Sequence, residues 1–187
     1  MTLLVLGLAL FFGAHMIVWV PGLRDAVVAR LGRKPYRGLI ALTSVAGLVL
    51  AAVGYGGAPY EPLYAPPAWG RSLTLPLVFA AMVLLPAANM RTNLKRYTRH
   101  PMLWGTVAWG AGHLLVRGDL RAALLFGGFV AYALVEMMAA NRRGATLSDR
   151  RYPISKDLIV LAAGTVAFLV LGYAHRWLFG VPVLPLP

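Results

Sequence analysis

The chain has 187 residues, of which 59% are hydrophobic and only 13% are charged, and its mean hydropathy is +0.70. Soluble domains carry about 25% charged residues, so this composition is typical of an integral membrane protein and leaves no room for a separate soluble domain. The sequence contains no cysteine, which excludes disulfides and thiolate-bound metals.

Six apolar stretches meet or approach the roughly 20 residues that a membrane-spanning helix needs. They are Thr2–Val20, Gly38–Gly56, Leu73–Met90, Met102–Val116, Leu120–Ala140 and Leu158–Phe179. The sequence therefore predicts an all-α bundle of about six transmembrane helices in a single domain, residues 1–187. The fourth stretch is short unless its helix begins at Pro101, because proline suits the first helical position. No Lys or Arg precedes the first stretch, so we expect a retained helix rather than a signal peptide.

The 18 Lys and Arg residues, which give a formal net charge of +12, are distributed unevenly. The first predicted loop holds Arg24, Arg30, Arg33, Lys34 and Arg37; the third holds Arg91, Lys95, Arg96 and Arg99; the fifth holds Arg142, Arg143, Arg150, Arg151 and Lys156. The other side holds Arg71, Arg117, Arg121 and Arg176. The positive-inside rule then places the three basic loops in the cytoplasm and both termini outside. The asymmetric distribution of basic residues across a lipid bilayer explains the net charge of the chain, and we expect no nucleic-acid partner.

The second predicted loop, residues 57–69, is rich in proline and aromatic residues. Tyr60, Tyr64 and Trp69 suit the headgroup level of a membrane, where amphipathic rings settle. Anchoring at the interface is the simpler interpretation of this loop, and a lid over an outward-facing cavity is the alternative. Two pairs of small residues, Gly47/Ala51 and Ala108/Gly112, predict close contacts between helices.

Two histidines, His15 and His113, lie within predicted spans, where an unpaired polar group is costly. Each could simply bond to a backbone carbonyl or to a hydroxyl of another helix. Alternatively, both bind a metal, since neutral imidazole is the commonest metal ligand. A zinc or copper site needs three or four ligands, whereas two histidines suit the two axial positions of haem iron. The sequence therefore favours haem over a bare metal ion.

The residues around His113 suit a large, flat ligand. Gly105, Gly110 and Gly112 remove side chains near it, Gly13 does the same near His15, and Trp109 lies one turn before His113 on the same face. His100 lies between Arg99 and Pro101 and is expected to cap the fourth helix, or else to contact a polar edge of the ligand. His175 is expected to be solvated, and Glu136 to pair with Arg142, Arg143 or a basic residue of the third loop. Haem propionates would need cationic partners, for which Arg37, Arg96, Arg99, Arg117 and Arg121 are candidates.

The segment Thr98-Arg99-His100-Pro101-Met102-Leu103-Trp104-Gly105, followed by Trp109, His113-Leu114-Leu115 and Gly118-Asp119-Leu120, resembles the signature of NnrU proteins. The resemblance extends to His15, to Pro66-Pro67-Ala68-Trp69 and to Leu125-Phe126-Gly127-Gly128, and thus covers essentially the whole chain.

This resemblance implies a multi-pass protein of the bacterial inner membrane that supports nitrite reductase and nitric oxide reductase in denitrification. The same domain forms 15-cis-zeta-carotene isomerase, which holds haem b between two histidines that match His15 and His113. The resemblance thus implies haem b bound by these two residues, and the residues themselves add His100, Arg99, Trp109 and Gly110 as candidates for the cofactor site. The partners it implies are the denitrification reductases or an apolar small molecule.

Three other interpretations remain open. The first is a haem-dependent isomerase acting on an apolar polyene, although Gly110 stands where the carotene isomerase has a cysteine proposed as an alternative iron ligand. The second is an S-adenosylmethionine methyltransferase of the isoprenylcysteine type, which shares the Arg-His-Pro motif. Such enzymes also carry a pair of glutamates and a downstream segment with Tyr and Pro. This chain offers only the single Glu136 and Tyr152-Pro153, and His15 would have no role in such an enzyme. The third is a structural protein without a cofactor.

Overall fold

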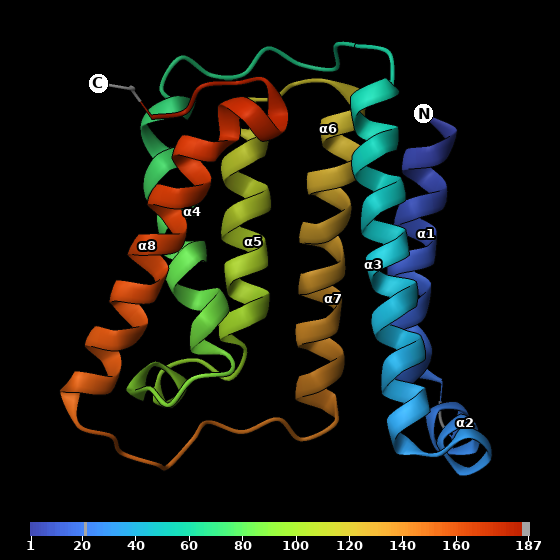
Figure 1. Cartoon of the computed structure of the whole chain (residues 1–187). Helices are drawn as coiled ribbons and strands as arrows, with labels where there is room; N and C mark the ends of the chain where they lie inside the picture. The colour runs from blue at the N-terminus through green and yellow to red at the C-terminus, as the bar shows by residue number, and fades with distance from the viewer. Residues whose placement is uncertain (21, 185–187) are drawn as a thin grey trace. The chain divides into compact units, whose positions relative to one another are not determined.

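A computed structural model describes residues 1–20 and 22–184 of the chain. As predicted, the described residues form helices and loops, with one isolated bridge between Pro62 and Asp119 (Figure 1). The chain divides into two compact units. The N-terminal unit consists of Met1–Ala65 and Arg117–Gly128, and the C-terminal unit of Pro66–Val116 and Phe129–Pro187.

Two long helices, α1 (Thr2–Met16) and α3 (Arg33–Gly57), form the body of the N-terminal unit. The 3₁₀ turn η1 (Ile17–Trp19) extends α1, and the short helix α2 (Leu23–Leu31) leads toward α3. The unit ends with α6 (Leu120–Ala122) and the π-helical segment η3 (Ala123–Gly127).

Glycines bring the backbones of α1 and α3 into direct contact. A Cβ atom added at Gly47 would lie 2.8 Å from the carbonyl oxygen of Gly7 and from the amide nitrogen of Phe11. Added Cβ atoms at Gly7 and Gly54 would collide with the backbones of Ala51 and Leu4. The predicted close contact at Gly47/Ala51 is therefore confirmed, and it allows dispersion contacts along the full helix pair.

The proline-rich loop is held by hydrogen bonds to the segment that precedes α6. The amides of Leu63 and Tyr64 donate to the carbonyl of Gly118, and the amide of Leu120 donates to the carbonyl of Glu61. The Tyr64 hydroxyl donates to the carbonyl of Arg117 at 2.8 Å. Partial burial raises the pKa of Tyr64, and the negative charge of Asp119 raises it further. The hydroxyl therefore remains a donor at neutral pH.

Asp119 is fully buried and organises the start of α6. Its Oδ1 accepts a hydrogen bond from the amide of Ala122, which is an N-cap interaction, and forms an ion pair with Arg121 at 3.2 Å. Arg121 also donates to the carbonyl of Ala58 at 3.0 Å, and its guanidinium lies over the ring of Tyr55. Through these contacts, α6 stabilises the end of α3 and the first residues of the proline-rich loop.

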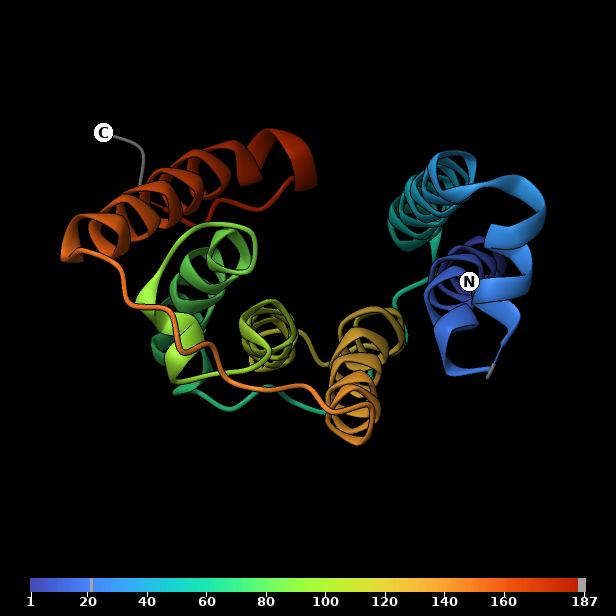
Figure 2. The same ribbon diagram turned by 90° about the horizontal axis from the view of Figure 1, so that it is seen from below.

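The C-terminal unit is built around α4 (Gly70–Ala87), which packs between α5 (Pro101–Leu114) and α8 (Ile154–Phe179), as Figure 2 shows. Gly105 and Gly112 of α5 lie against α4, and the Thr74 hydroxyl of α4 donates to the carbonyl of Gly112 at 2.8 Å. On the α8 side, a Cβ atom at Gly164 would lie 2.7 Å from the Cα of Val83. The 3₁₀ turn η2 (Asn93–Arg96) connects α4 to α5, and α7 (Gly128–Arg142) precedes α8.

Among the residues that the structure describes, five helices are long and apolar enough to cross a membrane: Thr2–Trp19, Arg33–Gly57, Gly70–Ala87, Leu120–Arg142 and Ile154–Phe179. They correspond to five of the six predicted spans, so the chain is a membrane protein, but the count of six is not confirmed. The expected span Met102–Val116 is the helix α5, which begins at Pro101 as predicted but has only 14 residues. At 1.5 Å per residue it measures about 21 Å, less than the roughly 30 Å of a hydrocarbon core.

Nevertheless, α5 runs antiparallel to α4 along most of that helix. Gly105 lies opposite Ala81 and Leu84, and Leu115, just after α5, contacts Gly70, the first residue of α4. The short helix therefore returns the chain to the end of the unit where α4 began.

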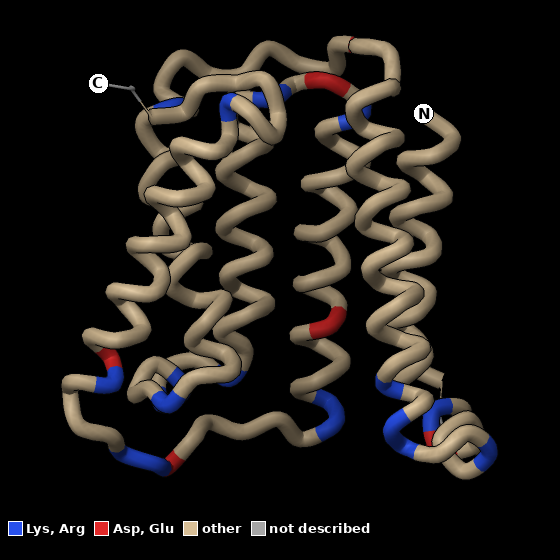
Figure 3. The backbone as a smooth tube through the Cα atoms, in the orientation of Figure 1, with Lys and Arg blue, Asp and Glu red and all other residues tan. Residues whose placement is uncertain are grey.

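Lys and Arg residues lie near helix ends and in loops, whereas the long helices are uncharged in their middle parts except at Glu136 (Figure 3). In the C-terminal unit they gather around η2 and the segment between α7 and α8. Glu136 forms the predicted ion pair with Arg143, one of its three expected partners.

Candidate functional site

His15 lies in the last turn of α1, where its ring is half-buried. Its Nδ1 lies 2.9 Å from the carbonyl oxygen of Phe11, one helical turn earlier. The carbonyl can only accept, so Nδ1 carries the proton and donates. The Phe11 ring stacks on the imidazole, with ring centroids 4.3 Å apart and planes 29° from parallel. One residue thus holds the imidazole both by its backbone and by its ring.

His113 has the same arrangement in the last turn of α5. Its Nδ1 donates to the carbonyl of Trp109 at 2.8 Å, and the Trp109 ring centroid lies 5.1 Å from the imidazole centroid. Phe129 packs edge-on against Trp109 at 5.6 Å and holds the indole in place. The prediction that Trp109 and His113 share one helix face is therefore confirmed.

The Nδ1–H bond determines which nitrogen of each ring is basic. A neutral imidazole protonated at Nδ1 carries its lone pair on Nε2. In metal sites the non-ligating ring N–H is nearly always bonded to a carbonyl or carboxylate, which fixes the ring orientation and raises the basicity of the ligating nitrogen. Both histidines have this second interaction, so each presents Nε2 as the atom able to ligate iron. The same carbonyl bond was also expected for a purely structural histidine.

His15 belongs to the N-terminal unit and His113 to the C-terminal unit. Their joint ligation of one iron therefore remains a prediction. Within residues 1–20 and 22–184, the structure contains no cluster of three or more His, Asp or Glu side chains that could hold a metal ion.

Two of the glycines predicted to make room for a flat ligand have a different role. An added Cβ at Gly105 would lie 3.2 Å from Leu84, and one at Gly112 would lie 3.2 Å from Val78, so both serve the contact with α4. Gly110 is also buried. Gly13, two residues before His15, has no atom within 4 Å of the position of a Cβ. Of the glycines assigned to the ligand, Gly13 therefore fits that role best.

His100 occupies the N-cap position of α5, but its side chain makes no capping hydrogen bond, so the expected capping role is wrong. Instead, its Nε2 lies 2.9 Å from Oδ1 of Asn141, which also accepts from Arg99 at 3.1 Å. Asn141 is in the last turn of α7. The Arg-His-Pro motif therefore ties the start of α5 to the end of α7, a contact between residues 41 positions apart.

Other candidate residues have roles that do not involve the two imidazoles. Arg121 already serves Asp119 and the carbonyls of residues 55 and 58, so it is a poor partner for a propionate. His175 donates through Nδ1 to the carbonyl of Val181 rather than to water alone. Sequence reasoning missed Phe11, although an aromatic residue four positions before each of the two histidines is visible in the sequence.

Comparison with known proteins identifies one family. The model of the NnrU family, described as NnrU protein, matches residues 3–183. No curated protein and no solved structure matches the chain significantly. The match runs through both units and includes the two anchored histidines, and the chain therefore belongs to the NnrU family.

Proposed function

We propose that this NnrU protein binds haem b, that His15 and His113 would hold its iron, and that it acts in the nitrogen-oxide metabolism of a bacterial inner membrane. The observation that carries the proposal is the shared arrangement of the two imidazoles. Each lies in the last turn of a helix, donates Nδ1–H to the carbonyl four residues earlier and packs on an aromatic ring. When bound, the haem would supply a redox-active iron.

The protein's own contribution is to hold the two ligands ready. Because the Nδ1–H bonds fix both rings before the cofactor arrives, little orientational freedom is lost when Nε2 meets iron. Phe11 and Trp109 shield one side of each imidazole and keep its surroundings apolar. The open backbone at Gly13 leaves space beside His15 for the edge of a macrocycle.

The orientation of the chain in the membrane is part of the same proposal. We place the basic loops in the cytoplasm and both termini in the periplasm, because fourteen of the basic residues lie in the first, third and fifth loops. The antiparallel course of α5 along α4 supports this topology, since it returns the chain across the unit before the segment that leads into α6. Because α5 is shorter than the hydrocarbon core of a typical bilayer, the bilayer would become locally thinner around this helix.

Genetic complementation tests the role in denitrification. In cells that lack the chain, we expect nitrite reductase and nitric oxide reductase activities to fall and the wild-type chain to restore them. His15→Ala and His113→Ala should each restore less than about a tenth of the missing activity, because removal of a metal ligand costs at least the 10- to 100-fold of an outer-shell change. His175→Ala is the matched control and should restore it fully. Full restoration by both ligand variants would show that the histidines are not needed.

A further inference from the structure

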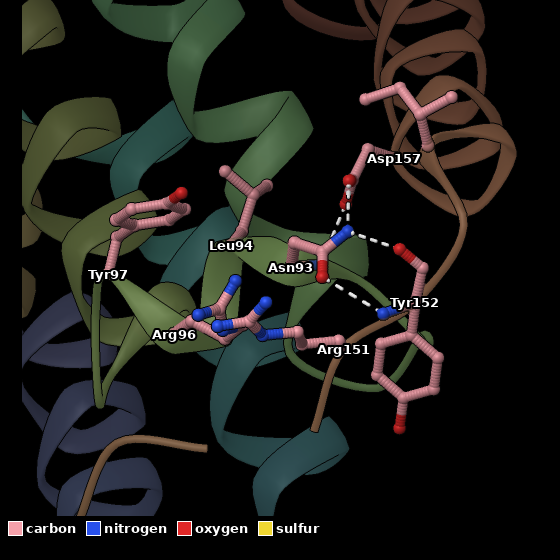
Figure 4. A pocket seen from close by; sticks show the side chains of 8 residues that line it. Asn93, Leu94, Arg96, Tyr97, Arg151, Tyr152 and Asp157 are labelled. Carbon is pink, nitrogen blue, oxygen red and sulfur yellow. Dashed lines mark hydrogen bonds between the residues drawn. The ribbon is translucent and has the colours of Figure 1, made fainter. Parts of the chain in front are cut away.

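A cavity of about 550 Å³ lies at the basic end of the C-terminal unit, between η2 and the segment that leads into α8 (Figure 4). This volume falls within the range of small-ligand sites. The residues that line it are Asn93, Leu94, Arg96, Tyr97, Arg151, Tyr152, Ile154 and Asp157. Arg96 is also a candidate partner for a haem propionate, whereas the other lining residues are not candidates for the haem site. A ligand in this cavity therefore does not require haem to be bound.

Asn93 and Asp157 build a fixed wall for this cavity. The Asn93 side chain donates to the carbonyl of Tyr152 at 2.9 Å and accepts from the amide of Tyr152 at 3.0 Å. It also donates to one carboxylate oxygen of Asp157 at 2.6 Å. The other oxygen of Asp157 accepts from the amide of Asn93 and from the hydroxyl of Thr92, which is fully buried. These bonds join segments 59 to 65 residues apart, so the cavity is part of the folded unit.

The lining of the cavity carries a net positive charge, because two arginines stand against the single carboxylate of Asp157. Arg96 and Arg151 both line it, and in Figure 4 their guanidinium groups lie in the same region of the pocket. The ion pairs among the described residues are Arg24–Asp25, Arg121–Asp119 and Arg143–Glu136, and neither of these arginines takes part. The carboxylate of Asp157 is already bonded to Thr92 and Asn93. Two guanidiniums at one cavity favour an anion that accepts several hydrogen bonds, which is the chemistry of phosphate.

The rim of the cavity is apolar and exposed. Tyr97 is 79% exposed and Ile154 is 71% exposed, and the next turn of α8 adds Leu158 at 58%. The cavity lies between the end of α4 and the first turn of α8, two helices that are long and apolar enough to cross a membrane. In a bilayer crossed by these helices, their ends would lie near the headgroups. A soluble phosphate would use the arginines but not the apolar rim, whereas an anionic phospholipid would use both.

We propose that this cavity binds the phosphate of an anionic phospholipid, with Arg96 and Arg151 contacting the phosphate oxygens and Tyr97 and Ile154 contacting the start of the acyl chains. Occupancy would hold η2 and the start of α8 at the membrane surface.

Native mass spectrometry of the purified full chain, titrated with phosphatidylglycerol, tests this proposal. The double variant Arg96→Gln/Arg151→Gln should bind phosphatidylglycerol about thirtyfold more weakly than wild type, given about 1 kcal/mol for each of the two basic residues at a lipid surface. The control is Lys95→Gln/Arg150→Gln, which removes the same charge from adjacent positions outside the cavity lining and should bind like wild type. Arg96→Lys/Arg151→Lys should bind with intermediate affinity, because lysine keeps the charge and loses the bidentate fork. It also provides the comparison if the glutamine variant does not fold.

Two further arms identify the source of the phosphate. Phosphatidylcholine should bind the wild type about as weakly as phosphatidylglycerol binds the arginine variant, and inorganic phosphate at equal concentration should not displace bound phosphatidylglycerol. Equal weakening of binding in the two double variants would overturn the proposal in favour of general surface charge. Displacement of the lipid by inorganic phosphate, or equal binding of the two lipids, would overturn it as well.

Discussion

Replacing His15 or His113 by alanine should remove the proposed haem from the purified protein. We expect the ratio of haem to protein in His15→Ala and in His113→Ala to fall at least about tenfold below that of the wild type, because even an outer-shell change costs 10- to 100-fold in metal affinity. The haem content is measured as the pyridine haemochrome after expression with ample haem. The helical content of both variants should be unchanged, because the aromatic ring that packs against each imidazole belongs to the same helix, one turn away.

Matched variants separate ligation from packing. His175→Ala removes another half-buried imidazole whose Nδ1 bonds to a backbone carbonyl, and it should keep its haem. Phe11→Leu and Trp109→Leu keep the carbonyls that fix the histidines and remove only the aromatic rings. We expect these two variants to retain haem with a shifted spectrum. If His15→Ala and His113→Ala both keep full haem content, the ligand assignment is wrong.

The second large effect concerns the close contact of α1 and α3. Gly54→Ala should lower the free energy of unfolding by about 3 kcal/mol, as expected for overpacking a tight interface. The added Cβ would collide with backbone atoms of Leu3 and Leu4, which cannot move aside as a flexible side chain would, so the two helices must separate. Unfolding in sodium dodecyl sulfate, followed by circular dichroism, measures the change.

Gly56→Ala, two residues further along the same helix, is the control. No atom lies within 4 Å of the Cβ position of Gly56, and alanine is a better helix former than glycine. Its stability should therefore stay within about 1 kcal/mol of the wild type. An equal decrease in the two variants would show that α1 and α3 are not held by this contact.

The long helices could be predicted from the sequence because apolar runs of sufficient length have few alternatives in a membrane. The short length of the fourth stretch could also be predicted, but the position of its C-terminal end could not. The apolar run continues to Val116, but the helix ends at Leu114, and the turn that follows leads to Gly118, whose carbonyl accepts hydrogen bonds from the proline-rich loop. A composition window does not detect such contacts between segments more than 50 residues apart.

In the candidate site, too, contacts within one helix could be predicted from the sequence, whereas contacts between distant segments could not. The anchored state of each histidine depends on the residue four positions earlier, so Phe11 and Trp109 are both recognisable from helical spacing. The partner of His100 is Asn141, and the wall of the cavity joins Asn93 to Asp157. Neither pair follows a local pattern, because each depends on which helix ends meet.

The glycines of α5 illustrate the same limit. Their spacing from His113 suggests room for a ligand, whereas Gly105 and Gly112 in fact lie against α4. Local spacing does not show which neighbouring helix fills the space that a glycine leaves.

The most direct test of the central claim is the absorption spectrum of the purified wild-type chain, oxidised and reduced, after expression with ample haem. We expect the sharp reduced bands of a six-coordinate b-type haem, with one haem for each chain. A colourless protein of correct helical content would contradict haem binding, and the anchored imidazoles of His15 and His113 would then be structural.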